Sequence, residues 1–538
     1  MKNTSLLLRV FFVLIAISLL GFLWQLNQKN TTEIKASGGT LKEGIIGTPR
    51  FINPVLAQSQ ADLDLTRLLF TPILSIDREG EVYYGLADSL DISENKKIYT
   101  LTIKNTLSFS DGSKLNADDV IFTVKSIQDN LIKSPLNTQW QGVQIEKVNQ
   151  YTITFTLDRP FSDFIYNLQI GVLPSNIWES IDAQEFIFSN YNSRPIGSGP
   201  YVIQDIDFEE NGVPNRYTLE RNHGHIEEPY IKNIELQFFD NEETLIKNLS
   251  KNTIGAAYGI SPVTAFKLKE ELVSSATLPR VFALFFNQEK QPLLKSKKIR
   301  EAINLGINKQ NITENIFKGY ASPINSIIGL PEREIIFDQQ KAKEIIESEN
   351  WVLNKDGIYS KDINNTKTDL SFSVSIPNIP DMQAVAESIS SDLGTIGIKL
   401  IVRSYEQGNL TQDVIRPREY ESLLFGYEIE KPSDLYAFWH SSQISDPGLN
   451  VSLFKKTSID AALTNLRTST TPELQKINDE IIQEYPAVFL FSPSYIYVLP
   501  KNVKGTSFSI HKSSDRFNTL KDWYIRTRHI WPLFTNKK

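Results

Sequence analysis

Apolar and polar residues alternate with a period of two in two neighbouring stretches of the chain. In residues 97–105, KIYTLTIKN, the side chains of Tyr99, Leu101 and Ile103 fall on one face, and polar side chains fall between them. Residues 151–157, YTITFTL, repeat the pattern. Strict alternation is typical of a half-buried strand. Because short polar breaks bound both stretches, we predict two strands that belong to hairpins.

The period changes to helical spacing after residue 116. Apolar side chains recur at i, i+4 and i+7, at Val120, Val124 and Ile127. Asn116 precedes them as a helix N-cap, and Asp118 and Asp119 fill the first turn, where free backbone N–H groups and the helix dipole favour carboxylates. Two adjacent aspartates also suit a metal site or an acid–base pair. Since capping accounts for both residues, we predict that they serve the architecture of the chain.

A second amphipathic helix is predicted near the middle of the sequence. Four apolar side chains of residues 299–307 share one helical face, namely Ile299, Ala302, Ile303 and Ile307. The pattern places Arg300 and Glu301 on the outside of this helix. We therefore expect a core helix with charged side chains facing water.

The first thirty residues contain a long apolar run. Lys2 and Arg9 precede a run from Val10 to Trp24, and counted from Leu6 the stretch has about 19 residues, or about 28 Å as a helix. We predict an uncleaved transmembrane anchor over 1–29, with the rest of the chain outside the cell because the positive residues come first. A cleaved export signal is the alternative, and it delivers the body to the same side. The polar residues 30–38 are expected to form a stalk.

Composition excludes several classes of function. A chain of 538 residues is too long for one hydrophobic core and predicts several compact units. The net charge is −7 and no long Lys/Arg tract occurs, so nucleic acid is not an expected partner. The absence of cysteine excludes disulfides, thiolate metal sites, a cysteine nucleophile and lipid attachment through an N-terminal cysteine.

Catalytic motifs are missing as well. The chain has five histidines and contains no H-E-x-x-H, G-x-S-x-G or Walker sequence. His223 and His225 flank a glycine, but two imidazoles do not make a metal site. We therefore predict that the protein is not an enzyme and needs no cofactor or resident metal.

A series of sequence blocks resembles one known family. The blocks include RPIGSGPYVI at 194–203 and YTLERN at 217–222, and further blocks lie at 38–77, 85–127, 295–329 and 338–351. In this order they resemble family 5 of the extracytoplasmic solute-binding proteins, the oligopeptide, dipeptide and nickel receptors of ABC importers. The resemblance covers about residues 39–500.

The resemblance implies a fold and its division. It implies an α/β, two-lobed fold like that of periplasmic binding proteins, of type II and in the large cluster C form with an extra inserted subdomain. One lobe is expected to combine residues 39–85, 194–280 and 490–530. The inserted subdomain is expected at 86–193, and the second lobe at 281–489.

The resemblance also implies a ligand site in residues 425–442, FGYEIEKPSDLYAFWHSS. In peptide-binding members a Gly-Trp strand end pairs with an extended peptide, and an aspartate three residues after the tryptophan neutralises the α-ammonium. Here Gly426 keeps its place, Tyr427 replaces the tryptophan, and Glu430 stands at the position of the aspartate. Asp434 competes with Glu430 for that role. A solvated loop is the alternative for these two carboxylates.

Three further residues complete the candidate site. Glu428 belongs to the same strand end, and Trp439 follows in the same segment. Trp439 is either a cleft residue or a core residue. The strand before Gly426 lacks the arginine with which relatives grip a peptide carboxylate, and Arg416 is the nearby candidate for that role.

Two functions from different classes follow from the resemblance. The first is a monomeric, membrane-anchored receptor that binds peptides, or a related small solute, and delivers them to ABC permease subunits. The second is a surface sensor or adhesion protein that keeps the fold without transport. The complete set of blocks favours the first function, and the altered ligand motif favours the second.

Overall fold

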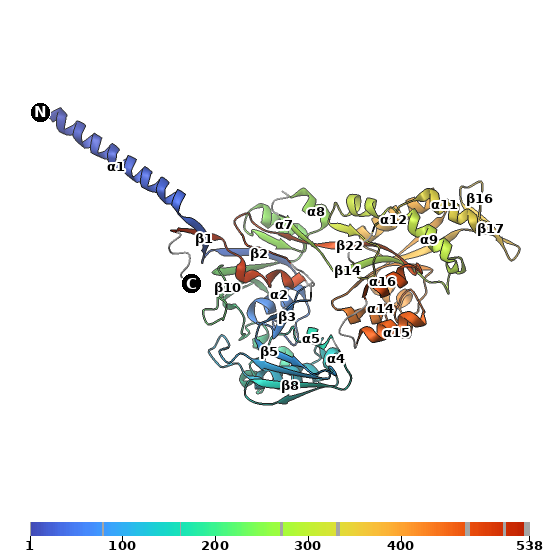
Figure 1. Cartoon of the computed structure of the whole chain (residues 1–538), viewed down its shortest axis with the longest axis horizontal. Helices are drawn as coiled ribbons and strands as arrows, with labels where there is room; N and C mark the ends of the chain where they lie inside the picture. Colours follow the sequence, from blue (N-terminus) through green and yellow to red (C-terminus); the bar gives the residue numbers. More distant parts are fainter. Residues whose placement is uncertain are drawn as a thin grey trace.

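The computed structural model describes residues 2–77, 80–161, 163–268, 273–329, 334–467, 474–508 and 513–531. Within these residues twelve strands form one sheet that extends through both lobes (Figure 1). Ten of its strands lie in the order β20 (Lys399–Tyr405), β19 (Ser371–Pro377), β21 (Ser422–Glu428), β14 (Arg280–Phe286), β22 (Ala487–Val498), β12 (Ala256–Tyr258), β2 (Thr40–Ile46), β11 (Asn233–Phe239), β10 (Pro214–Arg221) and β9 (Tyr201–Phe208).

The long strand β22 joins the two lobes of the sheet. Its first half pairs with β14, and its second half pairs with β13 (Val273–Thr277) and β12. The short strand β15 (Ala321–Pro323) pairs with its middle. Because one continuous strand belongs to both halves, the lobes are connected by sheet rather than by loops alone.

The first lobe carries smaller sheets beside the main one. A four-stranded antiparallel sheet contains β5 (Ala87–Ile92), β6 (Ile98–Ile103), β8 (Thr152–Leu157) and β7 (Val143–Lys147), and a two-stranded sheet contains β3 (Leu74–Ile76) and β4 (Val82–Tyr84). The second lobe ends in a three-stranded sheet of β16 (Val352–Leu353), β17 (Tyr359–Ile363) and β18 (Thr366–Asp369). Both predicted strands are confirmed, as β6 and β8, which pair directly.

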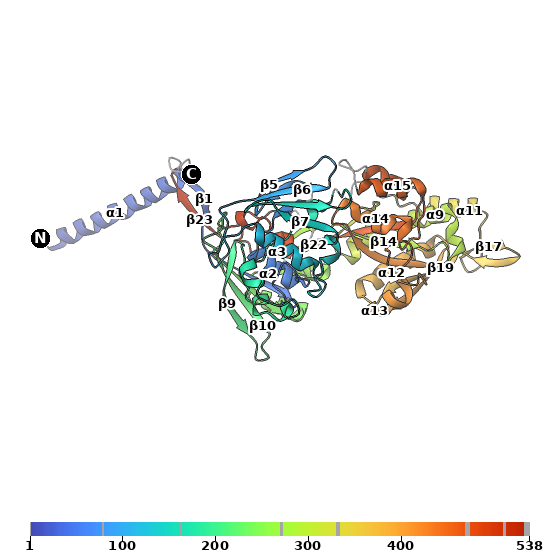
Figure 2. The ribbon, with the colours of Figure 1, turned by 90° about the horizontal axis from the view of Figure 1, so that it is seen from below.

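Helices pack against these sheets in both lobes, as Figure 2 shows from below. Those of the first lobe are α2 (Gln60–Leu69), α3 (Ala117–Gln128), α4 (Asn137–Trp140), α5 (Phe164–Asn167), α6 (Ser175–Trp178), α7 (Glu242–Ser250) and α8 (Pro262–Lys267). Those of the second are α9 (Lys297–Gly306), α10 (Lys309–Asn311), α11 (Gln339–Ser348), α12 (Pro380–Thr395), α13 (Gln407–Asn409), α14 (Leu435–Trp439), α15 (Thr457–Leu466) and α16 (Leu474–Ile482).

The hydrophobic cores follow the two lobes. One large cluster of buried side chains draws on residues between 41 and 256 and on the segment 495–523. Two others draw on residues between 281 and 491. The exact limits of the lobes and of the inserted subdomain stay a prediction.

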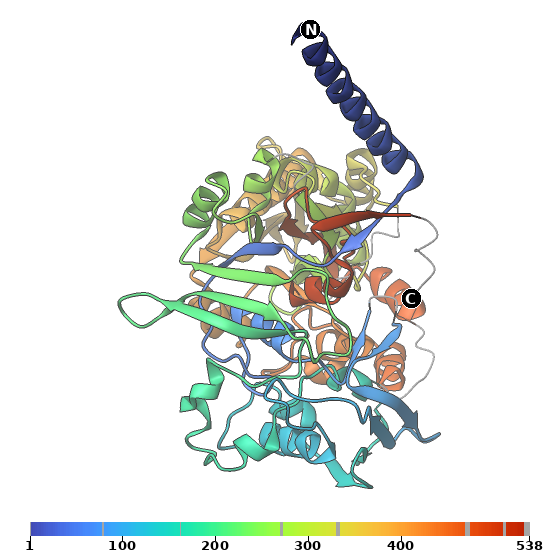
Figure 3. The same ribbon diagram turned by 90° about the vertical axis from the view of Figure 1, so that its left-hand side faces the viewer.

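The N-terminal helix α1 (Lys2–Asn30) projects away from the body (Figure 1). Its side chains from Val10 to Trp24 are exposed. As far as the structure describes the chain, no helix in it is long and apolar enough to cross a membrane. The segment predicted as a stalk contains β1 (Thr32–Ala36), which pairs with β23 (Arg526–Ile530) near the C-terminal end (Figure 3). Backbone hydrogen bonds therefore hold this segment to the body.

The predicted cap of α3 is confirmed. The side chain of Asn116 accepts a hydrogen bond from the Asp118 N–H, at 2.8 Å, and Asp119 accepts one from the Asn116 N–H, at 2.8 Å. The other oxygen of Asp119 accepts from the N–H and hydroxyl of Ser175, each at 2.8 Å. Asp118 instead forms an exposed ion pair with Lys147. The two aspartates thus serve the architecture, as predicted.

The predicted exposure of Arg300 is wrong. Helix α9 is present, but only 5% of Arg300 is exposed. Its guanidinium donates to the carbonyl oxygens of Tyr485, Glu484 and Leu294 at 2.7–2.8 Å. Two of these carbonyls belong to residues 184 and 185 positions away in sequence. The spacing of apolar residues along the helix could therefore not predict the burial of Arg300.

Candidate ligand-binding cleft

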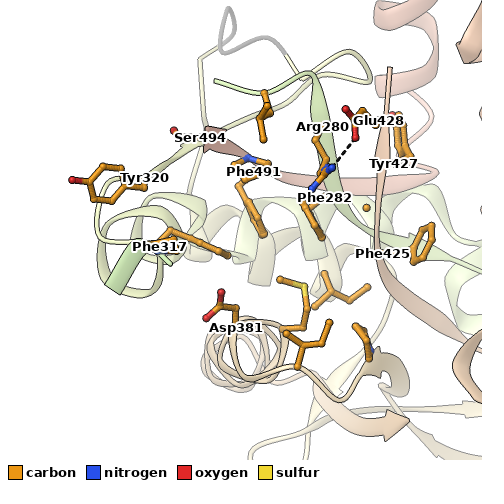
Figure 4. A pocket seen from close by; sticks show the side chains of 18 of the residues that line it. Arg280, Phe282, Phe317, Tyr320, Asp381, Phe425, Tyr427, Glu428, Phe491 and Ser494 are labelled. Atoms are coloured by element: carbon orange, nitrogen blue, oxygen red, sulfur yellow. Dashed lines mark hydrogen bonds and ion pairs between the residues drawn. The ribbon is translucent and has the colours of Figure 1, made fainter. Parts of the chain in front are cut away.

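Two cavities lie along the seam between the lobes, and Glu428 lines both. The first, of about 740 Å³, is bordered by β14, β21 and β22 and by the start of α12 (Figure 4). The second, of about 570 Å³, lies between α2 and α5 of the first lobe and residues 428–449 of the second. The end of β21 therefore stands between two neighbouring spaces.

Stacked aromatic rings form one wall of the first cavity. Phe282 on β14 stacks on Phe491 on β22, with ring centroids 4.9 Å apart and planes 8° from parallel, and Phe317 packs against Phe491 (Figure 4). Gly426 lies opposite Phe282 in the sheet. A Cβ at Gly426 would come within 2.7 Å of the Phe282 ring. Glycine is therefore required here because the ring occupies the place of its side chain.

The first cavity also contains charged groups. Arg280 pairs with Glu428 at 2.7 Å, and both side chains stay partly exposed. Asp381, at the start of α12, lines the opposite side. Burial raises the pKa of the Asp381 carboxyl, and the charge of Glu242 raises it further. The described lining thus combines a large apolar surface with a few charges, which is typical of sites for small ligands.

Tyr427 is held on the side of the second lobe. Its hydroxyl donates a hydrogen bond of 2.7 Å to the carbonyl of Ile327, and its ring stacks on Phe438 with centroids 4.5 Å apart. Burial raises the pKa of the Tyr427 hydroxyl. Tyr427 also lines the first cavity, so the contacts of its hydroxyl and its ring fix the end of β21 at the cavity wall.

The predicted carboxylates come together in the second cavity. Glu430 and Asp434 both line it, and Glu430 is exposed. Asp434 accepts hydrogen bonds from the N–H groups of Glu430 and Lys431, at 2.9 and 3.0 Å, and so caps the short helix η7 (Pro432–Asp434). Burial raises the pKa of Asp434. Asp434 therefore shapes the loop that presents Glu430.

This loop contacts the first lobe directly. The N–H of Ser433 donates a hydrogen bond of 2.8 Å to the carboxylate of Asp163, and both residues are buried. The ammonium of Lys431 lies 5.4 Å from the ring centre of Phe161. Residues 270 positions apart thus join the two lobes beside the second cavity.

Two predicted residues lie apart from both cavity linings. Trp439 is fully buried, and its ring packs against Phe285 and Phe489. Arg416 is exposed and lies 3.7 Å from Asp446. The structure therefore brings Gly426, Tyr427, Glu428, Glu430 and Asp434 together, and places these two elsewhere.

Sequence reasoning missed the contribution of the first lobe. Tyr258 lines the first cavity, stacks on Tyr495 and lies 5.1 Å from the guanidinium carbon of Arg516. Arg516 is fully buried and binds Glu43 and Asp64, each at 2.6 Å. Glu43 is 473 positions and Asp64 is 452 positions away from Arg516 in sequence, so no local pattern joins them.

The sequence and the fold match known proteins. The profile of the bacterial extracellular solute-binding proteins, family 5 Middle, matches residues 81–446. The chain belongs to this family. Its membership agrees with the resemblance seen in the sequence blocks, and it places the chain among extracellular binding proteins.

Relatives of this family 5 protein include peptide-binding proteins. It is 25% identical to the oligopeptide-binding protein AppA of Bacillus subtilis over 517 residues, which cover 91% of this chain and 92% of that protein. The structure of AppA in complex with a nonapeptide is similar, with a TM-score of 0.66 over 92% of this chain and 100% of that one, at 22% identity. The structure of the substrate-binding protein CtaP from Listeria monocytogenes gives a TM-score of 0.75 at 23% identity, over 91% and 99%. The two-lobed α/β fold is therefore established.

Proposed function

We propose that this family 5 protein captures peptides between its lobes and delivers them to the permease of an ABC importer. The observation that carries the proposal is the pair of cavities that share Glu428 as a lining residue, because together they give a ligand space on both sides of the end of β21. An extended peptide fits such a space, since its backbone can pair with a strand end while its side chains enter apolar pockets. The names of its relatives support peptides as the ligand class.

Within this proposal each residue of the site has its own role. Gly426 and Tyr427 offer backbone groups to the peptide, and Glu430 neutralises its α-ammonium. Asp434 holds the loop of Glu430 in shape, and Glu428 is held by Arg280 between the two cavities. An ammonium taken out of water requires such a carboxylate.

The proposal includes the predicted anchor and the predicted domain limits. The apolar residues of α1 support attachment to the membrane, because a helix with exposed apolar side chains all round needs an apolar surrounding. The body would then work outside the cell as a monomer. The proposed lobe limits are 39–85, 194–280 and 490–530 for the first lobe, with an insert at 86–193, and 281–489 for the second lobe. A division into two lobes is supported by the buried clusters, one of which draws on residues 41–256 and 495–523 and two of which draw on residues 281–491.

Ligand class is tested by thermal unfolding of the purified protein. A ligand that binds only the folded state stabilises it by mass action, by about 2.7 kcal/mol at a hundredfold excess over Kd. We expect peptide mixtures to raise the melting temperature, and free amino acids, sugars and chelated nickel to leave it unchanged. A shift with chelated nickel alone would replace peptides by a metal chelate as the ligand.

The role of Glu430 is tested with paired peptides. Glu430→Ala is expected to weaken binding of free-amine peptides by about tenfold, the usual size of one charged hydrogen bond, and to leave N-acetylated peptides unaffected. Glu419→Ala, which removes an exposed carboxylate of the same lobe outside both cavities, serves as the control. Equal losses for both peptide types would remove Glu430 from the site.

A further inference from the structure

The wall of the second cavity contributed by the first lobe contains two buried side-chain oxygen atoms without a hydrogen-bond partner among the described residues, one in an amide and one in a hydroxyl that can donate as well as accept. Among the described residues, neither Asn167 Oδ1 nor Thr66 Oγ1 has a hydrogen-bond partner. Both side chains line the cavity of about 570 Å³. Only 4% of Asn167 is exposed. Buried polar atoms are normally paired, so an unpaired one that faces a ligand cavity calls for an explanation.

The orientation of the Asn167 amide is fixed by its neighbour. Its Nδ2 donates a hydrogen bond of 2.9 Å to the carbonyl of Gln139, which can only accept. A flipped amide would place an oxygen against that carbonyl and lose the bond. The free position of Asn167 is therefore an acceptor, and the group that completes it must be a donor.

Charge adds a second constraint on that donor. The same cavity is lined by four carboxylates and two cations, namely Glu428, Glu430, Asp434, Asp515, Arg67 and Lys431. Lys431 lies over the Phe161 ring, and Arg67 donates to the side chains of Asn518 and Ser75. A positively charged donor is thus favoured over a neutral one.

We infer that Thr66 and Asn167 are specificity-determining residues that bind the free amino end of the ligand. This rests on the proposed function, and it deepens it. Glu430 comes from the second lobe, whereas Thr66 and Asn167 come from α2 and α5 of the first. An ammonium held by both walls has its N–H groups satisfied only when the lobes are together. The amino end of the peptide would then link the two lobes and couple recognition to closure.

The inference is tested with a synthetic mixture of lysine-free peptides of three to six residues, supplied with free or N-acetylated amino ends to the full chain in detergent. Thr66→Val replaces the unpaired hydroxyl by a methyl group of the same shape. We expect at least tenfold weaker binding of free-amine peptides, with a melting temperature of the ligand-free protein that is unchanged or higher. A residue with a purely structural role would not show this split.

Asn167→Leu and a control complete the experiment. Asn167→Leu should also weaken binding of free-amine peptides at least tenfold, whereas Asn137→Leu, which removes a hydrogen-bonded amide outside the cavity lining, should bind like the wild type. If Thr66→Val and Asn167→Leu bind free-amine peptides like the wild type, or lose acetylated peptides equally, the inference fails. If the wild type binds neither peptide type, the proposed function is wrong, and the inference that rests on it is wrong as well.

Discussion

Asp118 and Asp119 are neighbours in the first turn of α3, but their carboxylates make different contacts. Asp119 is buried and accepts three hydrogen bonds, from Asn116 and twice from Ser175. Asp118 faces water and pairs with Lys147. Because a buried donor left without its acceptor is costly whereas an exposed ion pair contributes little, the two residues differ in their effect on stability.

Asp119→Ala is expected to lower the free energy of unfolding by about 2–4 kcal/mol, since it leaves two buried donors and one part-buried donor unpaired. Asp118→Ala should lower it by less than about 1 kcal/mol. Urea unfolding of the two variants measures the difference, and each variant is the matched control of the other. Similar losses would show that Asp119 does not hold Ser175 in solution.

Lys309 should make the free energy of unfolding depend on pH, and the direction of the change follows from the burial of its ammonium group. It is buried and donates to Asn304 and to the carbonyl of Ile324, and no carboxylate pairs with it among the described residues. Burial lowers the pKa of Lys309 from 10.5 to about 7. Between these values the unfolded chain binds one more proton than the folded chain. The free energy of unfolding should therefore rise with pH, by at most about 1.4 kcal/mol per unit.

The test compares urea unfolding of the wild type and Lys309→Met from pH 7 to 9, below the range in which tyrosines ionise. The wild type should gain stability across this window, and the variant should gain much less. Lys361→Met, at a lysine that bonds the carbonyl of Glu349 near the surface, controls for the loss of a charge. If the free energy of unfolding of Lys309→Met rises with pH as steeply as that of the wild type, the pH dependence comes from another titratable group.

At the scale of elements, the hydrogen bond between Ser433 in η7 and Asp163, the residue before α5, joins the two lobes beside the second cavity. Asp163→Ala leaves the buried N–H of Ser433 unpaired when the lobes are together, at a cost of about 1–3 kcal/mol. We expect a larger radius of gyration for the ligand-free variant in X-ray scattering. Asp163→Asn keeps an acceptor oxygen and should resemble the wild type. Identical profiles for Asp163→Ala and the wild type would mean that this contact does not set the position of the lobes.

Elements with local signals were predictable, and those built by distant residues were not. The alternation at Tyr99 and Leu101 and the cap at Asn116 depend on neighbours within a few residues, and both predictions are confirmed. Arg300 lies on a correctly predicted helix, but its partners include residues 184 and 185 positions away. Only a family resemblance pointed to the segment around Gly426. Nothing local pointed to Asn167, since asparagine is common in turns and a lone one does not indicate a binding site.

At the scale of the whole molecule, the two lobes share a sheet that limits how they can move. Strand β22 pairs with β14 in one lobe and with β13 in the other, and β13 leads into β14 within a few residues. Rotation of one lobe against the other must therefore be absorbed around residues 278–280 and 491–494, where the pairing partners change. Hinges of this kind allow two rigid bodies to close around a ligand.

Closure should depend on a ligand that touches both walls, because a ligand shifts an equilibrium only by its difference in affinity for the two states. If free-amine peptides bind as proposed, to Glu430 on one lobe and to Thr66 and Asn167 on the other, they should reduce the radius of gyration of the wild type. The variant Thr66→Val should close less at equal occupancy, since one wall has lost a contact while the other is intact. If peptides bind tightly but leave the scattering profile unchanged, the lobes are already together without ligand, and the seam between them serves as a fixed pocket rather than a closing cleft.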